Sequence, residues 1–141
     1  MNYDVDNVFA KIIRDEAPAH RVYEDESILA FMDIMPQIDG HTLVIPKCPA
    51  RDLFDVPAAM LGRTILVTQR IAGAVRSAFS ADGVMVAQLS GAAAGQTVFH
   101  LHFHVLPRYD GIDFRLHAKD PAPAAILAEH ADRIRQALNA V

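Results

Sequence analysis

Three histidines, His100, His102 and His104, stand at alternate positions of one apolar segment. Successive side chains of a β-strand point to opposite faces, so this spacing predicts a strand over 98–107 with the three imidazoles on one face. The residues that would face the other way are Leu101, Phe103 and Val105. Pro107 cannot donate to a sheet ladder and should end the strand. Three imidazoles together are costly in a core and unusual on a surface, so they indicate a functional site.

Histidines at this spacing suit two chemistries and one structural arrangement. Two or three imidazoles on one strand face could ligate zinc. A neutral imidazole, with an unperturbed pKa of about 6.5, could act as a nucleophile, acid or base at phosphorus. The third arrangement is a histidine-rich interior held by hydrogen bonds to the backbone. The chain has no CxxC and no HExxH motif, so we rank catalysis above metal binding while all three stay open.

A loop of small residues precedes the histidines and favours phosphate chemistry. The small residues from Gly91 to Gly95 would let backbone N–H groups approach an anion closely. Gln96 and Thr97 would add side-chain donors at the mouth of the strand. Such a loop is weak support alone, but it stands directly before the histidines.

The rest of the chain predicts the elements that position these residues. Helices are expected over 8–14, 57–79 and 123–139, and strands over 21–24, 28–34, 41–46 and 84–89. With the histidine strand they make one α+β domain over 1–141, an antiparallel sheet of about five strands with a long helix and a C-terminal helix. Asp33 lies near the end of an otherwise apolar strand, as a turn residue or a ligand-binding carboxylate.

The long helix over 57–79 carries two apolar faces. One face has Leu61, Ile65, Ala72, Val75 and Phe79, and the other has Val67, Ile71, Ala74 and Ala78. A helix that covers one side of a sheet needs only one apolar face. The second face therefore predicts a homodimer, unless the helix is buried more deeply in its own domain.

Composition and charge argue against some classes of binding partner. The chain is 52% hydrophobic and 21% charged, with a net charge of −4, which argues against nucleic-acid polymers and anionic membranes as partners. A single cysteine, Cys48, excludes an intrachain disulfide and fits a reducing compartment. No signal peptide or membrane-spanning apolar run is visible, so we expect a cytoplasmic location.

Two blocks of the sequence resemble the histidine triad (HIT) superfamily of nucleotide hydrolases and transferases, most closely its Hint-like bacterial branch. The first block, AGQTVFHLHFHVLPR over 94–108, fits the His-φ-His-φ-His-φ-φ signature. The second comprises FMDIMPQ over 31–37 and GHTLVIPK over 40–47. Residues 9–13 fit more loosely. The resemblance covers roughly 7–110 and, with both blocks in order, is highly specific.

The resemblance implies a HIT-like fold with a sheet extended across a dimer, and hydrolysis at the α-phosphate through a covalent nucleotidyl-histidine intermediate. His102 would be the nucleophile, and His104 would contact the phosphate and assist protonation of the leaving group. His100 and His41 would belong to the supporting hydrogen-bond network. Further residues would bind the ribose (Asp33), the base (Phe9, Ile12, Phe31, Ile34 and Leu43) and the phosphate (Gly95, Gln96 and Thr97).

This chain departs from the family pattern at two places. Many relatives bind a structural zinc through two cysteines where this chain has Asn7 and Ala10, so we expect no metal and no other cofactor. Relatives also tend to carry an asparagine near residues 89–91, where Ser90 is the nearest polar substitute.

Purine nucleoside phosphoramidates, which yield AMP-type products, are the leading substrates that we expect. Three alternatives remain. The first is hydrolysis of dinucleoside polyphosphates, with Arg108, Arg115 and Lys119 contacting the longer phosphate chain. The second is a metal-binding protein that uses the three histidines. The third is a nucleotide-binding or scaffolding module with negligible turnover.

Overall fold

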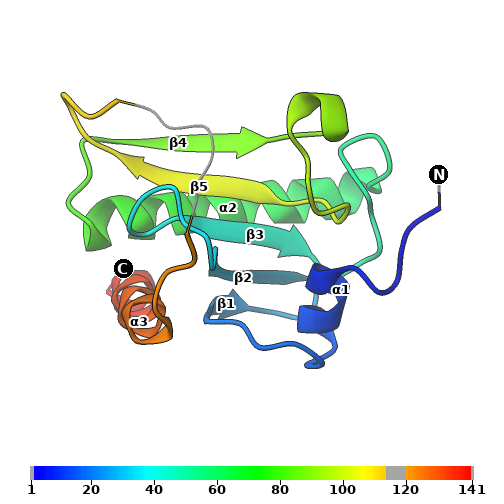
Figure 1. Ribbon diagram of the computed structural model, residues 1–141, viewed down its shortest axis with the longest axis horizontal. Coiled ribbons are helices and arrows are strands. Elements are labelled where there is room, and N and C mark those ends of the chain that lie inside the picture. Colours follow the sequence, from blue (N-terminus) through cyan, green and yellow to red (C-terminus); the bar gives the residue numbers. More distant parts are fainter. Residues whose placement is uncertain (1, 114–119, 141) are drawn as a thin grey trace.

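A five-stranded antiparallel sheet forms the centre of the computed structural model, which describes residues 2–113 and 120–140 (Figure 1). The strands are β1 (Arg21–Glu24), β2 (Ile28–Met32), β3 (Thr42–Pro46), β4 (Gly83–Gln88) and β5 (Phe103–Arg108), in the spatial order β1-β2-β3-β5-β4. The helices are α1 (Val8–Ile13), α2 (Ala58–Ala78) and α3 (Ala124–Asn139), with a short 3₁₀ turn, η1 (Ala92–Ala94). The predicted α+β architecture is confirmed.

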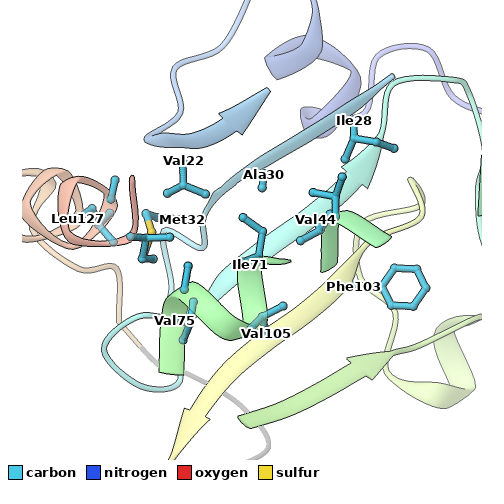
Figure 2. Close-up of a cluster of buried hydrophobic side chains, with 14 of the residues drawn as sticks. Val22, Ile28, Ala30, Met32, Val44, Ile71, Val75, Phe103, Val105 and Leu127 are labelled. Atoms are coloured by element: carbon cyan, nitrogen blue, oxygen red, sulfur yellow. The ribbon is translucent and has the colours of Figure 1, made fainter. Parts of the chain in front are cut away.

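The larger hydrophobic core lies between one face of the sheet and helices α2 and α3. Figure 2 shows Ala30 of β2, Val44 of β3 and Val105 of β5 close to Ile71 and Val75 of α2. Alternate residues of neighbouring antiparallel strands share a face, so each strand gives every second side chain to this core. The helices therefore leave the opposite face of the sheet to the other side chains.

A smaller apolar cluster covers part of the opposite face. Phe9 and Ile12 of α1 pack there on strands β2 and β3. The strand residues in this cluster are Leu29, Phe31, Leu43 and Ile45. Leu43 pairs with His104 of β5, so His104 lies on this second face. His104 thus lies on the side of the sheet that carries α1.

The histidine segment enters the sheet later than its spacing suggested. Strand β5 begins at Phe103, so His100 and His102 precede it. The N–H of Leu101 instead donates to the Ala50 carbonyl at 2.8 Å, outside the sheet ladder. The alternation itself holds, because Leu101, Phe103 and Val105 all lie in the helix-side core.

Pro107 lies inside β5 and does not end it, contrary to our prediction. It pairs with Val84 of β4, whereas pairing with β3 stops at Val105. At Pro107 the strand therefore has one sheet neighbour, and a missing N–H is tolerated on the free side.

Helix α2 buries one stripe and not two separate faces. The buried residues are Thr64, Val67, Thr68, Ile71, Ala74 and Val75, which combine members of both predicted faces. Thr64 and Thr68 can be buried because their hydroxyls donate to the carbonyls of Met60 and Thr64, at 2.7 and 2.8 Å. Ile65 and Leu66 are 44% and 63% exposed. The division into two apolar faces was wrong, because Val67, Ile71 and Ala74 of the second face lie in one buried stripe with Val75 of the first. The homodimer stays a prediction.

At 21 residues, α2 is long enough to raise the question of membrane insertion. Its apolar residues are interrupted by Arg63, Arg70 and Arg76. Within 2–113 and 120–140, no helix combines the length and apolarity needed to cross a bilayer.

Candidate active site

A cavity of about 460 Å³ lies on the α1 side of the sheet, and two of the three triad histidines line it. Its wall contains eleven residues that the sequence assigned to the site, namely Phe9, Ile12, Phe31, Asp33, Ile34, His41, Leu43, Gly95, Thr97, His102 and His104. Three others, Ser90, Gln96 and His100, do not belong to the wall. The chain thus brings α1, the end of β2, the start of β3 and the histidine segment to one place.

His102 is held by a bond between its ring and the backbone. Its Nδ1 lies 2.7 Å from the carbonyl oxygen of His100, so Nδ1 carries the proton and donates it. Burial lowers the pKa of His102, which keeps the ring neutral at neutral pH. Nε2 is left with a lone pair, and no other described residue hydrogen-bonds it. This is the state that a nucleophilic imidazole needs.

His104 receives its ring orientation from a chain of donors that starts in the backbone. The N–H of Gln37 donates to His41 Nδ1 at 3.2 Å, so the His41 proton sits on Nε2. His41 Nε2 lies 3.0 Å from His104 Nδ1 and donates to it. Burial lowers the pKa of His41 to about 3 and that of His104 to about 4. Neutral His104 therefore carries its proton on Nε2, as a donor.

Asp33 directly follows β2 and closes the loop that carries His41. Its N–H donates to the His41 carbonyl at 3.0 Å, and its Oδ1 accepts from the Met35 N–H at 2.8 Å. Its Oδ2 lies 3.5 Å from His41 Nε2. Because His41 is neutral near pH 7, this contact is not an ion pair. Burial raises the pKa of Asp33 to about 6, so the carboxylate is ionised at neutral pH and can accept hydrogen bonds.

His100 is fully buried and uses both ring nitrogens within the protein. Its Nε2 donates to the carbonyl of Pro46 at 2.7 Å, and its Nδ1 accepts from the Tyr3 hydroxyl at 2.5 Å. Burial lowers the pKa of His100 to about 4. The ring therefore supports the segment and does not face the cavity.

The predicted phosphate donors are placed differently from expectation. Gln96 Oε1 accepts from the Gly91 N–H at 2.7 Å, and its Nε2 donates to the carbonyls of Arg51 and Val98. The Ser90 hydroxyl donates to Gln88 Oε1 at 3.1 Å. Both side chains also satisfy backbone groups, because Gln96 binds those just named and the Ser90 hydroxyl accepts from the Leu53 N–H at 3.1 Å.

Gly95 and Thr97 do line the cavity, but only one of them presents a free donor. The Gly95 N–H donates to the Ala92 carbonyl at 3.0 Å, inside the η1 turn. Its φ of +102° is a left-handed conformation that favours glycine. The Thr97 hydroxyl has no hydrogen-bond partner in the part of the chain that the structure describes.

The cavity wall also contains residues that our reading of the sequence missed. These are Val8, Pro18, Ala19, Met32, Met35, Gln37, Leu89 and Val98. Met35 and Gln37 lie inside the block over 31–37 and could have been included on that ground. Val8 and Leu89 carry no local signal, because an apolar residue in a helix or beside a strand predicts a core position equally well.

Three possible metal ligands lie close together in the described part of the chain. Asp33, His41 and His104 each bring one possible ligand atom within 4.8 Å of the others, a different set from the three histidines of the motif. In the structure the two nitrogens of this set, His41 Nε2 and His104 Nδ1, are joined by a hydrogen bond of 3.0 Å. The expectation of no metal stays a prediction.

Asn7, where the family resemblance led us to expect a cysteine, caps helix α1 together with the backbone of Ala10. The Asn7 side-chain oxygen accepts from the Ala10 N–H at 2.9 Å and caps the start of α1. An asparagine cap typically stabilises a helix by about 1 kcal/mol.

The buried histidines predict that acid destabilises the fold. Below about pH 6.5 the unfolded chain takes up protons on histidine, while the folded pKa values of His41, His100 and His104 stay near 3 to 4 and that of His102 is also lowered. Stability is therefore lost as the pH falls from 6.5 toward 4. Asp33, with its raised pKa, contributes in the opposite direction but is a single group.

Urea unfolding at pH 7 and pH 5 checks this prediction. We expect a lower free energy of unfolding at pH 5, because four lowered histidine pKa values outweigh one raised carboxyl pKa. An unchanged or higher free energy at pH 5 would contradict it.

Comparison with known proteins identifies a family with which this chain shares its sequence. The HIT domain family matches residues 14–111. The HIT-like protein Rv1262c of Mycobacterium tuberculosis is 50% identical over 104 residues, which are 74% of this chain and 72% of that protein. The adenylylsulfatase HINT3 of Arabidopsis thaliana is 38% identical over 103 residues, which are 73% of this chain and 52% of that protein.

Solved structures agree with the fold. A Hit-like protein from Bartonella henselae, described as involved in cell-cycle regulation and crystallised with an unknown ligand, is 51% identical with a TM-score of 0.91, covering 96% of this chain and 99% of that one. A hypothetical histidine triad nucleotide-binding protein from Sulfolobus tokodaii is 29% identical with a TM-score of 0.87, covering 94% of this chain and 91% of that one. The chain belongs to the HIT domain family.

Proposed function

We propose that the chain is a hydrolase that acts at the α-phosphorus of a purine nucleotide through a covalent nucleotidyl-His102 intermediate. The observation that carries this proposal is the bond from His102 Nδ1 to the His100 carbonyl, which leaves the Nε2 lone pair at the cavity wall. The ring of His104 lies beside it, with ring centroids 4.9 Å apart, and offers a proton on Nε2. A nucleophile and a proton donor side by side are what displacement at phosphorus requires.

The proposed reaction has two displacements. In the first, His102 Nε2 forms a bond to phosphorus, the bond from phosphorus to the leaving group breaks, and the leaving group takes a proton from solvent while the Nε2–H of neutral His104 hydrogen-bonds it. His41 Nε2 donates to His104 Nδ1 and so keeps the His104 proton on Nε2. In the second, water attacks phosphorus, its proton passes to solvent, and the bond from phosphorus to His102 Nε2 breaks. The His100 carbonyl stabilises the positive charge on the nucleotidylated ring.

The remaining wall suits a nucleoside. The base would lie on the apolar part of the cavity, where the rings of Phe9 and Phe31 meet edge to face with centroids 5.3 Å apart. The ribose hydroxyls would donate to Asp33 Oδ2. The other carboxylate oxygen, Oδ1, already accepts from the backbone N–H of Met35. One relative is named a nucleotide-binding protein and another an adenylylsulfatase, which supports a nucleotide substrate.

The charges of the wall favour a short phosphate group over a long one. Among the described residues, the wall contains no lysine or arginine, and its donors near the histidines are neutral. Arg108, one candidate contact for a polyphosphate chain, donates to the Ile112 carbonyl at 2.9 Å. Arg115 and Lys119, the other two, lie outside the described residues. We therefore propose nucleoside phosphoramidates as the substrate class.

Replacing the nucleophile tests the proposed reaction. We expect His102→Ala to lower kcat for adenosine 5′-phosphoramidate by at least about a thousand-fold, since no other described imidazole has an unbonded nitrogen lone pair at the wall. Isothermal titration with AMP should still show binding, because the base and ribose contacts remain. His20→Ala, at a histidine outside the wall, is the matched control and should keep wild-type turnover. Near-normal turnover of His102→Ala, or net inversion at a chiral phosphorothioate, would refute the intermediate.

The leaving group is tested by comparing two substrates. We expect kcat/KM for adenosine 5′-phosphoramidate to exceed that for diadenosine tetraphosphate by at least about ten-fold, because the wall lacks cations for a longer phosphate chain. Steady-state rates at equal enzyme concentration check this. The reverse order would favour the polyphosphate hydrolase.

We also propose that the chain forms a homodimer through β4. This strand lies at the edge of the sheet, pairs with β5 alone among the described strands, and exposes 44% of Val86. An exposed edge is a template for pairing with a second copy. Ile65 and Leu66 add exposed apolar surface on α2.

Sedimentation analysis tests the dimer. At micromolar concentration we expect a mass twice that of the 15.4 kDa chain, and a monomer for Val86→Lys. Ile126→Lys on α3, where the side chain is also 44% exposed, is the control and should stay dimeric. A wild-type monomer would contradict the proposal.

A further inference from the structure

The stretch that carries the nucleophile lies outside the sheet. Strand β5 begins at Phe103, so the ladder that fixes His104 does not reach His102. A main-chain bond, from the Leu101 N–H to the Ala50 carbonyl at 2.8 Å, ties this stretch to another part of the chain. The position of residues 100–102 therefore also depends on side-chain hydrogen bonds, among them those of His100.

One of these bonds comes from the other end of the sequence. The Tyr3 hydroxyl lies 2.5 Å from His100 Nδ1, across 97 positions of sequence. His100 Nε2 donates to the Pro46 carbonyl, so Nδ1 is unprotonated and Tyr3 is the donor. Burial raises the pKa of Tyr3, so the phenol keeps its proton. The imidazole of His100 is completely buried, and no described residue other than Tyr3 reaches its Nδ1.

The same N-terminal segment also contacts the nucleophile through packing. The ring of Phe9 meets the ring of His102 edge to face, with centroids 5.0 Å apart, and that of His100 at 6.4 Å. The ring of Tyr3 meets His100 at 5.6 Å. Residues 3–9 thus contact both members of the pair His100 and His102, from outside the sheet.

We propose that Tyr3 is a positioning residue for the nucleophile, acting through His100. The inference rests on the proposed function. Tyr3 and Pro46 fix the His100 ring from opposite nitrogens, and the His100 carbonyl fixes the His102 ring through Nδ1. Without the hydroxyl, a buried acceptor would lack its donor, and the residue whose carbonyl orients His102 would lose one of its two anchors.

Tyr3→Phe tests this proposal because it keeps the ring and removes only the donor. We expect kcat, and the rate of nucleotidyl-histidine formation in rapid-quench experiments, to fall by about ten-fold. KM for the nucleotide should stay within about two-fold, because Tyr3 is not part of the cavity wall. Because a loss of folded enzyme would also lower the apparent kcat at constant KM, the amplitude of the rapid-quench burst, which counts active sites, should stay at the wild-type value.

Tyr109→Phe is the matched control. The Tyr109 hydroxyl donates to the Phe79 carbonyl at 2.7 Å, so this change also removes one partly buried phenol donor, away from the histidines. It should lower the melting temperature without changing kcat. An equal fall of kcat in both variants would mean that stability alone is responsible, and would overturn the proposal.

Nitrogen-15 NMR of the imidazoles gives a readout that does not depend on turnover. In the wild type, His100 should be neutral with its proton on Nε2, and the Nδ1 resonance should shift in Tyr3→Phe but not in Tyr109→Phe. Unchanged kcat in Tyr3→Phe, beside a wild type that forms nucleotidyl-histidine, overturns this inference alone. A wild type that forms none overturns the proposed function as well.

Discussion

The bond between the His102 ring and the carbonyl two residues earlier is the interaction on which the rest of the site depends. It decides which nitrogen of His102 has a lone pair, and it can do so only because His100 is itself immobilised. Burial then keeps the ring neutral, since a charged imidazole would lose its hydration inside the protein. Tautomer, orientation and charge state thus follow from the local backbone and its surroundings.

The sheet contributes by separating two environments. One face of β3 and β5 packs on α2 and has no ionisable side chain to satisfy, while the other carries His104 opposite Leu43. The loop between β2 and β3 brings Asp33 and His41 to that same face, because its two ends are joined by the bond from the Asp33 N–H to the His41 carbonyl. The polar side chains of the candidate site therefore lie at or near the ends of the strands.

Much of this was predictable from the sequence, and the misses have physical causes. Periodicity of two located the faces of the histidine segment, and apolar patterning located α2 and α3 to within one residue. Strand pairing was beyond local signals, because Pro107 is tolerated only where β5 loses one neighbour. The buried stripe of α2 was predicted wrongly because Thr64 and Thr68 belong to it. Their hydroxyls can be buried because they donate to backbone carbonyls of the same helix. Gln96 was predicted to bind phosphate, but its amide group donates to the carbonyls of Arg51 and Val98 and accepts from the Gly91 N–H. No sequence pattern indicates these bonds.

The cation-free wall of the cavity has a kinetic consequence. Attraction between a charged site and a phosphate would reach over a Debye length, roughly 8 Å at physiological ionic strength, and would accelerate encounter. A wall that holds neutral imidazoles and the ionised Asp33, on a chain of net charge −4, provides no such long-range pull. Capture of the proposed anionic substrate then relies on shape and on short-range hydrogen bonds formed after collision. Salt should accordingly not slow this capture, because it screens only the repulsion from the acidic chain, unlike in enzymes that steer their anions with lysine and arginine.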